Sequence, residues 1–114
     1  MKREMEKVRE LLLWMEAQDE WLFTYHDLPG LPDMNATIGY AQMLLSGGYL
    51  ESTQQGVVRI SWTGYEFLEK IGDPDIWQKT KAGAAEVGSW SIKLLGDLAA
   101  GFIRAKAIEL GLPL

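Results

Sequence analysis

The chain of 114 residues contains no cysteine. This absence excludes disulfide bonds, thiolate nucleophiles and zinc sites built on cysteine. The single histidine, His26, adjoins Asp27, but it has no second histidine to complete a metal site and no nucleophile beside it to activate. The sequence also has no GxSxG, GxGxxG or P-loop motif. We therefore expect no enzymatic activity, no metal and no cofactor.

Long apolar runs are also missing. The longest stretch without a formal charge covers residues 34–50 and includes Asn35, Gln42 and Gly48, whereas a membrane-spanning helix needs roughly 20 apolar residues. The first residues, MKREMEKVRELLLWME, are too charged for a signal peptide. We expect a cytoplasmic protein with no membrane partner.

Basic residues are scarce. The chain has 11 Lys and Arg against 16 Asp and Glu, a net charge of -5, and no Lys or Arg stands between Glu10 and Val58. This charge opposes non-specific attraction to the phosphates of nucleic acid. The length and the hydrophobic content of 47% are typical of a single folded domain.

The hydrophobic pattern predicts a first helix, a strand, a loop and a second helix. The first helix covers residues 2–18, and its inward stripe is Met5, Val8, Leu11, Leu12 and Met15. Residues 21–27 are β-favouring, and 28–33 form a loop with two prolines. The second helix is predicted over residues 36–46, with Asn35 as its N-cap and Gly47 and Gly48 ending it. Its predicted inner face is Ile38, Ala41 and Leu45.

A β-hairpin is predicted next, from residues 49–52 and 57–62, because Val58, Ile60 and Trp62 alternate with polar residues. Thr63 and Glu66 match a capping box at the start of a helix that ends near Ile71. Further helices are predicted from Pro74 to about residue 87 and from residue 92 to about 110. Large side chains expected in the core are Trp62, Phe67 and Trp77.

This order of elements is that of a winged helix-turn-helix. We expect an α+β, mostly helical fold, with a winged helix-turn-helix core over residues 1–72 and a two-helix C-terminal extension over 73–114. The helix before the hairpin would then be the recognition helix, and the hairpin would be the wing.

Four segments carry a resemblance to a known family. They are MKREMEKVRELLLWME, IGYAQMLLSGGYLES, RISWTGYEFLEKIGDPDIWQKTK and SWSIKLLGDLAAGFI, and the most specific piece is WTGYEFL followed by Trp77, Lys79 and Thr80. With these segments the chain resembles an uncharacterised family, a domain of unknown function, of small winged-helix proteins found largely in phages and prophages. The resemblance implies a winged-helix fold and a bacterial host, and it assigns no catalytic residues.

The scarcity of basic residues favours a protein partner, of host or phage origin, such as a host defence or regulatory complex. We expect the partner-binding residues to lie on the outward side of the second helix and on the charged face of the first: Trp14, Gly39, Tyr40, Gln42, Met43 and Ser46. Trp21 and Trp90 also stand at polar or broken positions and are further interface candidates.

The alternative is a dimeric, DNA-binding transcriptional regulator. Its phosphate contacts would come from Arg3, Lys7 and Arg59, and Gln42 could bond the edge of an adenine. In either case we expect a homodimer through the last helix, which is apolar nearly all round, with Leu94, Leu98, Gly101 and Phe102 in the interface. The other interpretation of that helix is that the remainder of the same chain encloses it.

Overall fold

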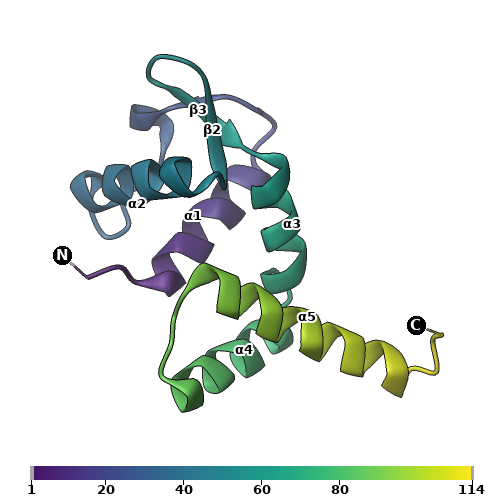
Figure 1. Ribbon diagram of the computed structural model, residues 1–114. Coiled ribbons are helices and arrows are strands. Elements are labelled where there is room, and N and C mark those ends of the chain that lie inside the picture. The colour runs from purple at the N-terminus through teal and green to yellow at the C-terminus, as the bar shows by residue number, and fades with distance from the viewer. Residues whose placement is uncertain (1, 114) are drawn as a thin grey trace. The chain divides into compact units, whose positions relative to one another are not determined.

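The computed structural model describes residues 2–113. Within this range, five α-helices and a small antiparallel sheet follow one another as shown in Figure 1. They are α1 (Met5–Ala17), β1 (Phe23–Thr24), the 3-10 helix η1 (Tyr25–Asp27), α2 (Met34–Gly47), β2 (Leu50–Gln54), β3 (Val57–Ile60), α3 (Trp62–Ile71), α4 (Pro74–Val87) and α5 (Ile92–Glu109). The chain divides into two compact units, Met1–Leu68 and Glu69–Leu114, which we call unit 1 and unit 2.

Helix α1 supplies the inner layer of unit 1. The buried residues of this helix are Met5, Val8, Leu11, Leu12 and Met15, which confirms the predicted stripe. They recur at helical spacing, so the helix can bury one continuous apolar side.

The strand predicted over residues 21–27 is shorter in the structure. Only Phe23 and Thr24 pair with β3, opposite Val58 and Val57. The chain then turns into η1, because the Thr24 backbone N–H donates to Asp27 Oδ2 at 2.8 Å. The hydrogen bonds from the Thr24 backbone and side chain also lower the pKa of Asp27.

Helix α2 begins earlier than predicted, and its N-cap is Asp33 rather than Asn35. Asp33 Oδ1 accepts a hydrogen bond from the Ala36 backbone N–H at 2.8 Å. The C-terminal prediction is confirmed, since Gly48 adopts the left-handed conformation with φ 85°.

The buried face of α2 also differs from the prediction. It consists of Ala36, Thr37, Tyr40, Ala41 and Leu44, whereas Ile38 and Leu45 are only half-buried. Polar groups can occupy this face because they find partners there. The Thr37 hydroxyl donates to the Pro29 carbonyl at 2.6 Å and accepts from the Leu31 backbone N–H at 2.8 Å.

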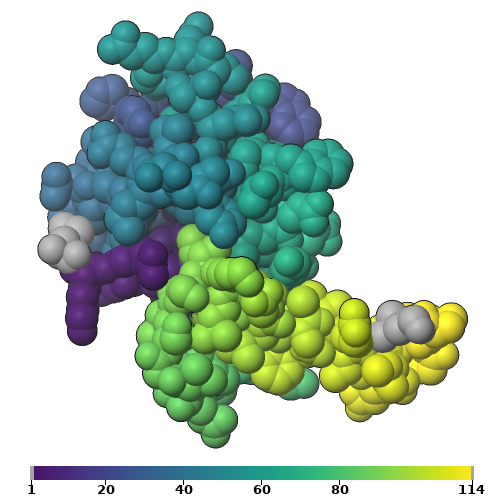
Figure 2. Space-filling view, in the orientation of Figure 1, coloured from purple at the N-terminus to yellow at the C-terminus, as the bar shows by residue number. Residues whose placement is uncertain are grey.

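The β-hairpin is confirmed. Strands β2 and β3 pair with Leu50 opposite Ile60, a bulge lies between Ser52 and Gln54, and Gly56 takes a left-handed φ of 78° in the turn. The strand order in the sheet is β1-β3-β2, so β3 is the central strand and pairs with both β1 and β2. In the space-filling view the hairpin turn is the teal projection from unit 1 (Figure 2).

The capping box predicted at Thr63 is wrong. The strand ends at Ile60 and α3 begins at Trp62, so Thr63 lies inside the first turn, where it is exposed. Ser61 takes the capping position instead, since its Oγ accepts from the Gly64 backbone N–H at 3.0 Å. The early start of the helix also turns Trp62 outward, to 81% exposure, which overturns its predicted place in the core.

Unit 2 contains α4 and α5, whose boundaries follow the prediction closely. Asp73 caps α4 by accepting from the backbone N–H groups of Asp75 and Ile76, and the following Pro74 occupies the first turn. Ser91 caps α5 through Leu94. Trp77 is fully buried, as predicted. No helix in the described part of the chain is both long and apolar enough to cross a membrane.

Candidate binding surface

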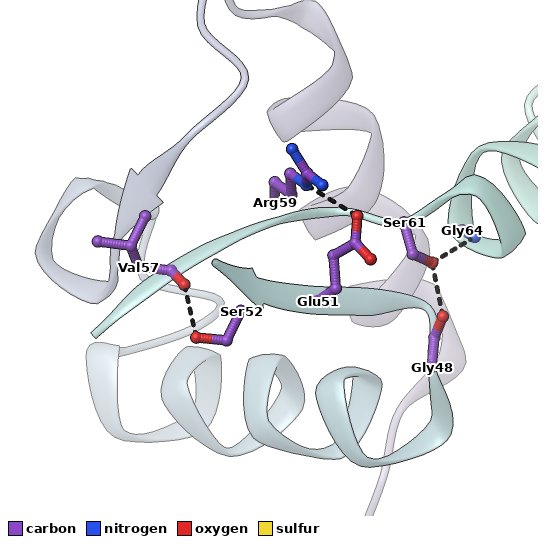
Figure 3. A network of polar contacts seen from close by, with 7 residues as sticks. All are labelled: Gly48, Glu51, Ser52, Val57, Arg59, Ser61 and Gly64. Carbon is purple, nitrogen blue, oxygen red and sulfur yellow. Dashed lines mark hydrogen bonds and ion pairs between the residues drawn. The ribbon is translucent and has the colours of Figure 1, made fainter. Parts of the chain in front are cut away.

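One serine joins the three elements that shape the end of unit 1. The Ser61 hydroxyl donates to the Gly48 carbonyl at 2.5 Å and accepts from the Gly64 N–H, so the end of α2, the end of the hairpin and the start of α3 meet at one side chain (Figure 3). Gly64 is required here, because a Cβ would overlap the Tyr49 carbonyl oxygen and lie 2.8 Å from Ile60 Cγ2. These contacts fix the hairpin between α2 and α3.

The outward face of α2 is small and uncharged. Gly39, Gln42, Met43 and Ser46 lie three, four and seven residues apart and therefore share one side of the helix. Gln42, Met43 and Ser46 are exposed and Gly39 is half-buried.

Tyr40, predicted to share the outward face of α2, is buried, and its hydroxyl accepts from the Glu4 backbone N–H at 3.2 Å. It lies inside because that hydroxyl reaches a backbone donor while its ring joins the core. Tyr40 is therefore a core residue and not part of the partner-binding set. Trp14 is half-buried, with its ring 5.7 Å from that of Phe23, so it presents only part of its surface.

Arg59 and Lys7, two of the predicted phosphate contacts, pair with carboxylates. Arg59 Nε donates to Glu51 Oε1 at 2.8 Å across the hairpin (Figure 3). Lys7 Nζ lies 3.7 Å from Glu10 Oε2, three residues further along α1. Arg3 is exposed ahead of α1. A phosphate would therefore compete with a carboxylate for Arg59 and Lys7.

A second surface of unit 1 combines exposed aromatic rings with carboxylates. Trp21, at 70% exposure, meets the Tyr65 ring edge-on, with centroids 6.1 Å apart. Trp62 precedes Tyr65 by three residues on α3, so both face the same way. We define the aromatic-acidic surface as Trp21, Trp62, Tyr65, Glu16, Asp19 and Glu20.

A hollow of about 290 Å³ opens in this surface, lined by Glu16, Gln18, Asp19, Glu20, Trp21 and Tyr65. Partial burial raises the pKa of the Tyr65 phenol, and the negative charge of Glu16 adds to the effect. The phenol therefore stays neutral, and the charge around the hollow comes from carboxylates.

The charge of the chain is concentrated in unit 1. Residues 1–68 contain ten acidic and five basic side chains, a net charge of -5, whereas residues 69–114 contain six of each. The whole net charge of the protein therefore lies in the unit that contains the hairpin and the aromatic-acidic surface.

The residues expected at a dimer interface have mixed positions on α5. Leu94, Leu98 and Phe102 are half-buried, and Gly101 is exposed. Leu98 and Phe102 lie against α4, because a Cβ at Gly83 would contact their side chains at 3.5 and 3.9 Å. Enclosure by the same chain therefore accounts for part of the apolar surface. The C-terminal half of α5 extends beyond α4 (Figure 1), and Ile103 and Ile108 are exposed there.

Sequence reasoning identified Trp21 as an interface candidate but missed Tyr65 and Trp62. The available signals were the run of Glu16, Asp19 and Glu20 ahead of Trp21, and the three-residue spacing of the two aromatic residues. Within residues 2–113, no group of three His, Cys, Asp or Glu side chains is placed to hold a metal ion.

The fold is thus α+β, with its candidate binding residues spread over α2, the hairpin and the aromatic-acidic surface. The chain belongs to the DUF2513 family, whose model carries the description hypothetical protein and matches residues 2–91. The match ends directly before α5. Neither a curated protein nor a solved structure matches the chain.

Proposed function

We propose that this chain is a non-catalytic binding protein that engages a protein partner through the aromatic-acidic surface. The observation that carries the proposal is the exposure of Trp21 and Trp62, at 70% and 81%, within a unit of net charge -5. Large exposed aromatic side chains gain most from being covered by a partner, and tryptophan is enriched among the residues that dominate binding energies.

A winged helix-turn-helix scaffold is part of the proposal. Its support is the order of elements in unit 1 and the sheet order β1-β3-β2, in which α2 precedes the hairpin directly. The resemblance to phage and prophage proteins adds an accessory role in a bacterial host, with a host defence or regulatory complex as the partner.

The electrostatics of the hairpin and α2 favour a protein over DNA. Helix α2 contains no Lys or Arg, and Arg59 beside the hairpin turn is bonded to Glu51. Phosphate contacts from Lys and Arg supply a large share of the affinity of DNA-binding proteins, so a recognition helix without cations is expected to bind DNA weakly.

DNA binding remains the second candidate, because Gln42 is exposed on the helix that precedes the hairpin. Bidentate bonding of a glutamine amide to adenine is a common form of sequence recognition. A homodimer through the exposed part of α5 would then present two copies of α2 to a two-fold operator.

Titration of a labelled random-sequence DNA pool, and of individual duplexes enriched from that pool by the protein, followed by fluorescence anisotropy at about 150 mM salt, separates these functions. We expect no saturable binding by the full chain. Sub-micromolar, sequence-selective binding that is lost in Gln42→Ala would instead establish the DNA-binding function. In that case Arg59→Ala would weaken all sequences alike and reduce the salt slope by about one.

A further inference from the structure

The hollow beside Trp21 has a lining that selects for a particular ligand chemistry. Its lining combines the aromatic residues Trp21 and Tyr65, whose rings meet edge-on, with the acidic residues Glu16, Asp19 and Glu20. The face of an aromatic ring attracts a cation, most strongly when the ring is indole, and carboxylates attract it further. An anionic or purely apolar group would gain nothing from these carboxylates.

The size of the hollow favours an organic cation over a metal ion. Within the described residues the carboxylates do not converge into a group that could hold a metal, and the hollow that they help to line has a volume of about 290 Å³. A guanidinium group suits such a space, because it is planar, can stack on an indole, and can donate several N–H groups at once to separate carboxylates. An ammonium group has no plane to stack.

We propose that this hollow binds an arginine side chain from a basic segment of the protein partner. The inference rests on the proposed function and names the chemistry of its partner. Charge complementarity supports it, since unit 1 carries the whole net charge of -5. Trp62, one helical turn from Tyr65, would cover the apolar residues that flank the arginine.

The test uses the isolated full chain, labelled with ¹⁵N, and two small probes. N-acetyl-arginine methylamide carries the guanidinium, and N-acetyl-citrulline methylamide has nearly the same shape without the charge. We expect the arginine probe to shift the Trp21 indole N–H and the Tyr65 amide in a saturable manner, and the citrulline probe to bind at least about threefold more weakly, as the loss of a cation-aromatic contact predicts.

Four variants locate the effect. Trp21→Ala and the double variant Glu16→Gln/Glu20→Gln should each weaken arginine binding by about threefold or more. The matched controls are Trp90→Ala and Glu86→Gln in unit 2, which should leave it unchanged. Thermal unfolding of each variant checks that the fold is retained, which we expect because Trp21, Glu16 and Glu20 are exposed.

Three results would overturn the inference: no saturable shift, equal binding of the two probes, or the same shifts at the same sites with calcium ions. A lysine probe that binds more tightly than arginine would contradict the choice of guanidinium. None of these results concerns DNA, so they leave the proposed function in place. DNA binding in the anisotropy experiment would instead remove the proposed function, whatever the arginine probe does.

Discussion

Ser61 shows how one side chain decides where two elements meet. It is 7% exposed, and it bonds the carbonyl that ends α2 and the N–H that opens α3. The sequence pattern placed the cap at Thr63, because Val58, Ile60 and Trp62 alternate as a strand does. The strand nevertheless ends at Ile60, because the hydroxyl of the next residue, Ser61, accepts a hydrogen bond from a backbone N–H of the first helical turn and so starts α3.

Replacing Ser61 therefore has a larger effect than replacing Thr63. We expect Ser61→Ala to lower the free energy of unfolding by about 1 to 2 kcal/mol, because it removes a helix cap and leaves a carbonyl without its donor. Thr63→Ala should change it by less than about 0.5 kcal/mol, as exposed positions without such contacts do. Chemical denaturation of both variants decides the matter, and equal losses would contradict the assignment of the cap.

At the scale of elements, the apolar stripes predicted the positions of the helices, whereas polar contacts decided which face of α2 is buried. The stripe of α1 follows from periodicity, the ends of α4 follow from Asp73, Pro74 and Gly88, and α5 begins after Ser91. The face of α2 could not be predicted in this way. Thr37 and Tyr40 are buried because the loop before the helix and the backbone of Glu4 supply their partners, and neither is visible in the sequence.

The Asp73 cap of α4 makes the stability of the fold depend on pH. Hydrogen bonds, first from the Ile76 backbone N–H and then from that of Asp75, together with Lys106 and Lys79, hold the pKa of Asp73 below its ordinary value of 3.8. A carboxyl whose pKa is lower when folded stabilises the fold above its unfolded pKa and loses that contribution as pH falls through the folded pKa.

Asp73→Asn tests this effect, because asparagine can still cap a helix but cannot ionise. We expect the wild type to exceed the variant in free energy of unfolding near neutral pH. The difference should shrink as pH falls below 3.8, and denaturant unfolding at several pH values measures it. A difference that stays constant down to the acid range would show that the charge of Asp73 does not contribute.

At the scale of the whole molecule, the distribution of charge and of exposed apolar side chains says more about the binding partner than the fold does. The sequence alone argued against DNA binding, because no Lys or Arg stands between Glu10 and Val58. It did not reveal the aromatic-acidic surface, because Tyr65 and Trp21 are 44 positions apart and are joined only by a ring contact that arises in the folded chain.

The proposed homodimer is tested on the exposed part of α5. Ile108 is 61% exposed, so Ile108→Glu should separate the copies without disturbing the packing of α4 on α5. Sedimentation at micromolar concentration should give twice the chain mass of 12.8 kDa for the wild type and the single mass for the variant. A wild type that sediments as a monomer would remove the dimer from the proposal.

The central claim, that the aromatic-acidic surface binds a protein, is tested most directly by capture from bacterial lysate, with and without nuclease treatment. The baits are the full-length wild type, Trp21→Ala/Trp62→Ala, and Gln42→Ala/Ser46→Ala as the matched change on the exposed face of α2. We predict one protein retained in stoichiometric amount by the wild type and the α2 variant, and lost from the tryptophan variant. Retention by the tryptophan variant with loss from the α2 variant, or retention that nuclease abolishes, would contradict the account.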